Sequence, residues 1–185
     1  MLRYNIDYLN ELEKNGDPLQ FLFFWGHTAK NKLEISKSCL SQWYEIPFTV
    51  NNITYPTAEH YMMAQKALLF GDEDIYRKII SSEKPGAAKE FGRHINGFDE
   101  VIWDENKTDL VVAGNYYKFS QHPGLRHFLI NTGSRILVEA SPADFIWGIG
   151  LAENNPAAAD FRNWPGKNLL GFALMEVRDQ LRSSQ

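Results

Sequence analysis

The stretch that most constrains how this chain can fold runs from Pro56 to Ala67. Proline suits the first turn of a helix, Thr57 can cap free backbone amides, and the alanine, methionine, glutamine and lysine residues that follow favour helix. Gly71 and Asp72 supply a stop signal. The sequence therefore predicts a helix that starts next to Pro56 and ends before Gly71.

Similar patterns predict helices through most of the remaining chain. Apolar residues at helical spacing and capping residues predict helices after Asp72 and over 85–91 (with Gly92 as its stop), 104–121, 123–130 and 168–181. Ser141 and Pro142 are typical of another helix start. Residues 136–140 fit either a buried strand or the start of an irregular segment.

The N-terminal part of the chain predicts one helix and a few short strands. Residues 3–15 form an amphipathic pattern, and the aromatic run over 21–25 favours a strand. Residues 43–50 and 53–55, joined by two asparagines, predict a tight hairpin. A few strands followed by many helices predict a helix-rich α+β fold, a single domain of seven or eight helices with a small N-terminal hairpin or sheet.

The length and the net charge of the chain limit the number of domains and the kinds of partner that we expect. A chain of 185 residues with 44% hydrophobic residues fits one domain with a sizeable core. The net charge is −4 and there is no lysine- or arginine-rich run, so bulk electrostatic binding to nucleic acid is not expected, although a local anion pocket stays open.

Other motifs point to a cytoplasmic protein without a cofactor. The single Cys39 has no disulfide partner in the chain, which favours a reducing compartment. The first residues do not combine a basic flank with a long apolar segment, and no stretch reaches membrane-spanning length, so we expect a cytoplasmic protein. Phosphate-loop, dinucleotide-binding and serine nucleophile-elbow patterns are absent. The histidines, among them His122 and His127, lack a convincing metal spacing, so no metal is expected.

The central predicted helix carries the first candidate site residues. Glu59, Met63 and Lys66 share one face at positions i, i+4 and i+7. The two charged residues are about 10 Å apart along the axis, and a lysine leaning back toward the N-terminus can approach the carboxylate across a gap the size of a small molecule. Alternatively, Glu59 complements the helix dipole and Lys66 is solvated.

A second set of candidates combines tryptophan with glycine. Asp144, followed by Trp147 and Gly148, can form a pocket rim, because tryptophan offers a flat stacking face and glycine lets a ligand approach the backbone. The alternative is an aspartate cap beside a core tryptophan. Trp25 and Gly26 form a similar element after the first strand, where an aromatic residue is more often core than ligand contact.

Two further positions can contact an anion. Asn168 follows Gly166 and Lys167 just before the last predicted helix, where free amides and a cation can meet a phosphate. Arg93 can pair with a phosphate through two hydrogen bonds. Alternatively, Lys167 and Arg93 are solvated cations.

Taken together, these residues resemble the YbiA-like family, also called NADAR, whose members are associated with NAD and ADP-ribose chemistry. The resemblance covers residues 21–182, which it implies form the NADAR domain, with 1–20 as an N-terminal helical extension. The matching elements follow the family's order: Tyr55–Tyr61 with Gln65-Lys66, Gly92-Arg93, Lys118-Phe119 with Gln121-His122, Leu137–Glu139, Asp144 with Trp147-Gly148 and Gly150, Asn168–Gly171 and Leu174–Arg178.

The resemblance implies an N-glycosidase that hydrolyses the bond between ribose C1′ and a base nitrogen. Two substrate classes are known in the family: ribosylamino-pyrimidine phosphates of riboflavin synthesis, and ADP-ribose attached to guanine. Members acting in riboflavin metabolism usually carry Phe-Ser-Asn-Phe where this chain has Leu40–Tyr44, and the loop over 151–165 is longer here. These departures favour ADP-ribosylated guanine, as a nucleotide-sized molecule, as a nucleobase adduct or within a nucleic acid.

The chemistry of such a bond suggests a role for each candidate. A lysine shielded in a pocket can attack C1′ and form a Schiff base with the opened ribose, so we expect Lys66 to be the nucleophile. Glu59 and Asp144 would share the acid, base and charge-stabilising roles. The expected substrate-binding residues are Trp25, Gly26, Arg93, Trp147, Gly148 and Asn168. A non-catalytic NAD or ADP-ribose sensor is the alternative; it would not need Glu59 and Lys66 together.

Overall fold

The computed structural model describes residues 2–28 and 34–183 and confirms a helix-rich α+β fold. The helices within these ranges are α1 (Ile6–Asn15), α2 (Ala58–Leu69), α3 (Glu73–Ile80), α4 (Pro85–Arg93), α5 (Glu100–Gln121), α6 (Pro123–Ile130) and α7 (Leu169–Ser183). Three short 3₁₀ turns also occur, at Lys37–Leu40, Pro156–Ala159 and Phe161–Asn163. The strands are β1 (Phe21–Phe24), β2 (Phe48–Val50), β3 (Ile53–Tyr55) and β4 (Ile136–Glu139).

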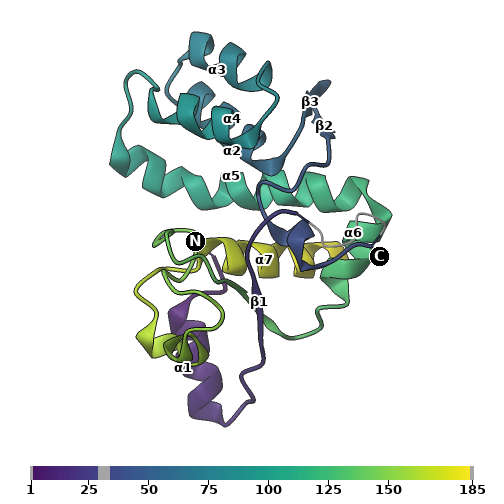
Figure 1. The fold of residues 1–185 in the computed structure, drawn as a ribbon, viewed down its shortest axis with the longest axis vertical. Helices are drawn as coiled ribbons and strands as arrows, with labels where there is room; N and C mark the ends of the chain where they lie inside the picture. The colour runs from purple at the N-terminus through teal and green to yellow at the C-terminus, as the bar shows by residue number, and fades with distance from the viewer. Residues whose placement is uncertain (1, 29–33, 184–185) are drawn as a thin grey trace.

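Helix α5 runs across the middle of the molecule (Figure 1). It packs against α2 on one side and α7 on the other, and α2 in turn carries α3 and α4. Helix α7 also packs against β4, which joins it to the small sheet. The predicted apolar stripe of α7 is buried as expected, so this helix forms much of the lower core.

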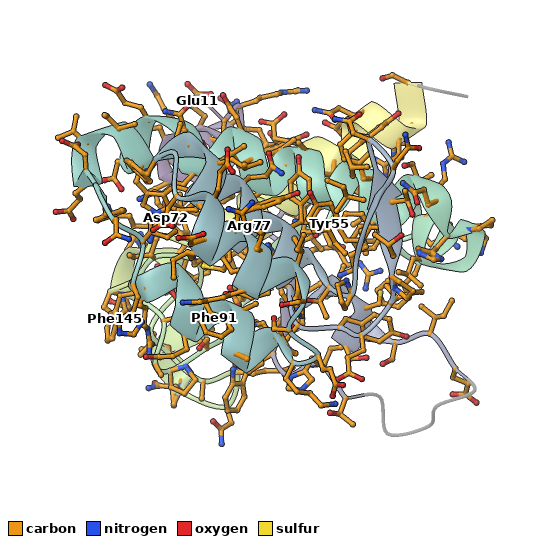
Figure 2. All side chains as sticks on the ribbon, turned by 90° about the horizontal axis from the view of Figure 1, so that it is seen from above. Glu11, Tyr55, Asp72, Arg77, Phe91 and Phe145 are labelled. Atoms are coloured by element: carbon orange, nitrogen blue, oxygen red, sulfur yellow. The ribbon has the colours of Figure 1, made fainter. Side chains whose placement is uncertain are left out.

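Helix α2 starts and ends close to where its sequence predicts. The Thr57 side chain accepts from the His60 amide at 3.3 Å and caps the first turn. Most of its residues, including Glu59 and His60, are buried, which is the pattern of a helix surrounded by other elements. The next helix, α3, is capped as predicted by Asp72, labelled in Figure 2, whose carboxylate accepts from the Ile75 amide at 3.0 Å.

The predicted hairpin is present but short. Strands β2 and β3 pair antiparallel, and Asn51 and Asn52 between them have φ values of 50° and 65°. Two positive φ values in a two-residue turn match the twist of the strands, and asparagine tolerates them. Residues 43–47, which were predicted to extend the first strand, lie outside it.

Strands β1 and β4 pair in parallel, with Phe21 opposite Ile136 and Phe24 opposite Glu139. This settles the two alternatives for residues 136–140 in favour of a strand. The pairing brings the residues that follow β1 next to those that follow β4, which positions the site described below.

Several predicted helix limits differ from the structure. Helix α1 begins at Ile6 and not at residue 3. Helix α4 continues through Gly92 to Arg93, because this glycine serves close packing and not termination: a Cβ at Gly92 would lie 2.2 Å from Met63 Sδ. Helix α5 begins at Glu100, after the Asp99 cap, and not at 104. The helix that Ser141 and Pro142 were predicted to start is not formed, because the residues directly after them form turns.

Candidate active site

A cavity of about 420 Å³ opens between α2, α4, the residues after β1 and the residues after β4. Four charged side chains contribute to its lining, namely Glu59, Lys89, Glu139 and Asp144. Five aromatic side chains do so as well, namely Phe24, Trp25, His27, Trp43 and Trp147. Acidic groups, one amine and flat stacking surfaces therefore meet in one place.

Glu59 lies in the first turn of α2 and is buried. Its backbone amide donates to the Gln42 carbonyl at 3.0 Å, whereas its Oε1 has no hydrogen-bond partner among the described residues. Burial raises the pKa of Glu59 to about 7, against the effects of the Lys89 ammonium and a hydrogen bond from Trp43. A buried carboxyl oxygen without a partner, facing a cavity, is suited to a ligand.

Glu139 ends β4 and is a second acid in the same cavity. Burial and, to a smaller extent, the nearby carboxyls of Asp144 and Glu59 together raise its pKa to about 8. Its Oε2 also lacks a partner within the described chain. The family-like segment containing Glu139 was recognised in the sequence, but the residue was not predicted to belong to the site; the available signal is a charged residue at the end of an apolar strand.

Asp144 lies where the sequence places it, beside Trp147 at the cavity. Its Oδ1 accepts from the backbone amides of Ile146 at 2.9 Å and Trp147 at 2.7 Å. These bonds cap a turn, not the predicted helix, and they fix the carboxylate relative to the Trp147 ring. Phe145, in the same turn, is exposed and stands at the edge of the molecule in Figure 2.

Lys66 is not where the prediction places it. Its Nζ donates to the Gly92 carbonyl at 2.9 Å and lies 4.2 Å from the centre of the Phe98 ring, and it does not contribute to the cavity lining. The packing of Gly92 on Met63 explains this difference, because α4 crosses α2 between the first turn and Lys66. Burial lowers the pKa of Lys66.

Among the residues that the structure describes, the lysine that lines the cavity is Lys89, on α4. Its Nζ lies 5.9 Å from the centre of the Trp43 ring, and its charge lowers the pKa of both Glu59 and Glu139. Lys89 was not predicted to belong to the site; the one available signal is its position one helical turn before Arg93. Arg93 itself is exposed, pairs with Glu90 at 2.9 Å and does not line the cavity.

Trp25 and Gly26 reach the cavity as predicted. Trp25 directly follows β1 and is 61% exposed, which contradicts the core alternative. Gly26 has a φ of 80°, a conformation that glycine adopts without strain. His27 then lies 5.6 Å from Trp43, measured between ring centres. The predicted tryptophan surface is therefore at the cavity mouth.

Asn168 and Gly148 support the site from behind and do not line the cavity. Asn168 is fully buried with a φ of 53°; its Oδ1 accepts from the Glu139 amide at 3.0 Å and its Nδ2 donates to the Leu137 carbonyl at 2.9 Å. The Asn168 amide also donates to the Gly148 carbonyl at 3.1 Å. The Asn168 side chain, which was predicted to bind substrate, is therefore already hydrogen-bonded within the protein. Its role in the structure is to fix the peptide that carries Glu139.

No cluster of three or more histidine, cysteine, aspartate and glutamate side chains within 2–28 and 34–183 is arranged to hold a metal ion. Across the same ranges, no helix combines the length and the apolar character needed to cross a membrane.

Comparison with known proteins identifies the family. The family model described as NADAR domain matches residues 23–182, so the chain belongs to the NADAR family. The chain is 43% identical over 166 residues to a protein named N-glycosidase R617 of Acanthamoeba polyphaga mimivirus, covering 87% of this chain and 96% of that one.

Two bacterial proteins extend the comparison. The chain is 36% identical over 135 residues to N-glycosidase YbiA of Shigella boydii, which covers 73% of this chain and 76% of the relative. The NMR structure of the E. coli protein YbiA superposes with a TM-score of 0.72 at 29% identity, covering 89% of this chain and 86% of YbiA. The chain is therefore an N-glycosidase, a hydrolase that acts on N-glycosyl bonds.

Proposed function

We propose that this N-glycosidase removes ADP-ribose from ADP-ribosylated guanine by cleaving the bond between ribose C1′ and the base nitrogen. The observation that carries the proposal is the cavity in which Glu59, Glu139 and Asp144 meet Lys89 beneath tryptophan side chains. Cleavage develops positive charge on the sugar and negative charge on the departing nitrogen, so it needs carboxylates for the first and a proton donor for the second.

The two buried acids divide these tasks with Asp144. With pKa values of about 7 and about 8, Glu59 and Glu139 hold protons near neutral pH. One of them can donate a proton to the leaving nitrogen while the Asp144 carboxylate stabilises the sugar cation. Asp144 is held for this role by its two backbone donors.

Lys89 takes the role that the sequence analysis gave to Lys66, because it is the lysine that lines the cavity. After a cavity carboxylate accepts its proton, the Lys89 amine attacks C1′. The C1′–N bond breaks and its electron pair leaves with the base, which takes the proton of the acid. Opening of the ribose ring gives a Schiff base, and water hydrolyses it to release the sugar and restore the amine.

The aromatic lining supports guanine over a pyrimidine as the leaving group. Three tryptophan side chains, from Trp25, Trp43 and Trp147, line the cavity, and the first of them is mostly exposed at its mouth. A bicyclic purine offers a larger face for stacking on such side chains than a single pyrimidine ring does.

The deciding experiment incubates the protein separately with an ADP-ribosylated guanosine and with a ribosylamino-pyrimidine phosphate. We expect release of guanosine and ADP-ribose from the first substrate and at least tenfold slower turnover of the second, with chromatography as the readout. Glu59→Gln serves as the inactive control. Faster release of aminopyrimidine would overturn the substrate assignment and favour the riboflavin intermediate.

A further inference from the structure

The turn that carries Gln42 into the cavity is held from both sides. The Gln42 carbonyl accepts from the Glu59 amide at 3.0 Å, which ties the turn to α2. On the other side, the buried Lys118 of α5 donates from Nζ to the carbonyls of Cys39 at 2.7 Å and Ser41 at 2.8 Å. The backbone of Gln42 is therefore fixed relative to both helices that flank it.

Asn115 determines which end of the Gln42 side-chain amide faces the cavity. Its Nδ2 donates to the Val111 carbonyl at 2.9 Å, and because a backbone carbonyl can only accept, the orientation of the Asn115 amide is unambiguous. The same Nδ2 donates to Gln42 Oε1 at 2.8 Å. Oε1 of Gln42 is thereby directed toward α5, which leaves its Nε2 for the cavity.

The Nε2 group of Gln42 is a donor at the cavity without a hydrogen-bond partner among the described residues. Gln42 is only 7% exposed and contributes to the cavity lining, yet its Nε2 donates to no group within the described residues. A side-chain amide that the protein leaves unpaired at a cavity is available to a ligand atom that accepts a hydrogen bond. Unlike the carboxyls around it, an amide donates at any pH.

We propose that Gln42 is a specificity-determining residue that donates from Nε2 to an acceptor atom of the bound nucleotide, and that Asn115 positions it. This inference rests on the proposed function, because it concerns the ligand of the same cavity. The acceptor belongs either to the ribose, as a hydroxyl oxygen, or to the base, as a ring nitrogen or carbonyl. A ligand that presents a donor at this position is rejected, because two donors would face each other.

The first experiment measures the binding of two separate probes by calorimetry, ADP-ribose for the sugar side and guanine for the base side. Gln42→Met keeps the length of the side chain and removes the donor. We expect the dissociation constant of one probe to rise about three- to tenfold, which identifies the source of the acceptor, while the other stays within about twofold. Gln121→Met, which changes a glutamine bound to Thr49 on the hairpin, is the matched control and leaves both constants unchanged.

The second experiment separates positioning from general destabilisation. Asn115→Leu removes the group that orients Gln42 and touches no ligand; we expect it to weaken the same probe as Gln42→Met. In the double variant the affinity should be no lower than in Gln42→Met alone, because both changes remove one interaction. Full additivity of the two losses, or unchanged affinity of Gln42→Met for both probes, overturns the proposal.

These outcomes can be distinguished from failure of the proposed function. If the protein does not cleave ADP-ribosylated guanine but Gln42→Met still weakens one probe, the substrate assignment fails and the role of Gln42 stands. If the wild-type protein binds neither probe, both the assignment and the role of Gln42 are overturned.

Discussion

Two carboxyl groups with raised pKa values line the same cavity, and they titrate as a coupled pair. Glu59 has a pKa of about 7 and Glu139 of about 8, each raised mainly by burial, and the charge of Glu59 adds to the shift of Glu139. At neutral pH the pair therefore holds at least one proton that can be given to a departing nitrogen.

We expect kcat to fall as the pH rises above about 8, because the last acidic proton of the pair is then lost. Glu139→Gln should lower kcat by about 100-fold at pH 7 and remove this descending limb. Steady-state rates between pH 6 and pH 9 provide the measurement, with Glu153→Gln, an exposed glutamate paired with Lys37, as the control. A descending limb that persists in Glu139→Gln would show that another group supplies the proton.

The raised pKa of Glu59 also leads to a prediction about the stability of the folded protein. Its folded-state pKa of about 7 lies above its ordinary value of 4.5, so its contribution to stability is fully present below pH 4.5 and is lost as the pH rises through 7. We therefore compare the unfolding free energy of Glu59→Gln with that of the wild-type protein at each pH. This difference should be more favourable to the variant at pH 8 than at pH 5 by on the order of 3 kcal/mol. Urea denaturation of both proteins at the two pH values tests this, and an equal difference at both would contradict the buried-acid assignment.

Lys89 and Lys66 provide a matched pair for the covalent step. Borohydride reduction during turnover should attach the sugar to Lys89, and mass spectrometry of peptides locates the adduct. We expect Lys89→Met to abolish trapping, whereas Lys66→Met retains it, because the Lys66 amine donates to the Gly92 carbonyl away from the cavity. An adduct on Lys66 would restore the assignment made from the sequence, and no adduct on either would favour direct attack by water.

At the scale of elements, the packing of α4 on α2 determines which helix positions reach the cavity. Gly92 lets Met63 fit against α4, and this contact separates Glu59 from Lys66 although both lie on one face of α2. Helical spacing predicts that shared face correctly. It contains no information about where a second helix crosses, so it could not show that Lys89 from α4 takes the place of Lys66 in the cavity.

Two glycines of α4 test this packing. Gly92→Ala places a Cβ 2.2 Å from Met63 Sδ, so we expect a loss of about 1–3 kcal/mol of unfolding free energy together with lower activity. Gly86→Ala, whose Cβ would meet Trp43 at an ordinary 3.6 Å, is the control in the same helix and should be neutral or slightly stabilising. Thermal and urea denaturation provide the comparison; equal effects of the two changes would contradict the packing argument.

Most helices and the hairpin could be predicted from local sequence because caps and turns are local. Thr57, Asp72 and the asparagine pair act within four residues of the backbone that they fix. The parallel pairing of β1 with β4 could not be predicted, since each strand has only four residues and no local signal marks its partner. Glu139 was missed for the same reason, because only that pairing brings it beside Trp25.

At the scale of the whole molecule, charge limits how a nucleic acid can bind. The net charge is −4 and the sequence has no basic run, so we expect at most two phosphate contacts. For ADP-ribosylated guanine in a single-stranded oligonucleotide, KM should rise no more than about sevenfold between about 50 and 200 mM salt, close to the rise for the mononucleotide. A steeper dependence for the oligonucleotide would reveal a basic surface that its composition does not indicate.

The parallel pair formed by β1 and β4 also has a consequence for synthesis. The ribosome releases β1 and the adjoining Trp25 early, yet the partner strand β4 begins more than 110 residues later. At roughly 5–20 residues per second, the nascent chain waits on the order of ten seconds with that tryptophan segment unpaired. A polypeptide that stops before Glu139 lacks this cavity acid and the partner strand of β1, so the cavity is complete only after β4 has been made.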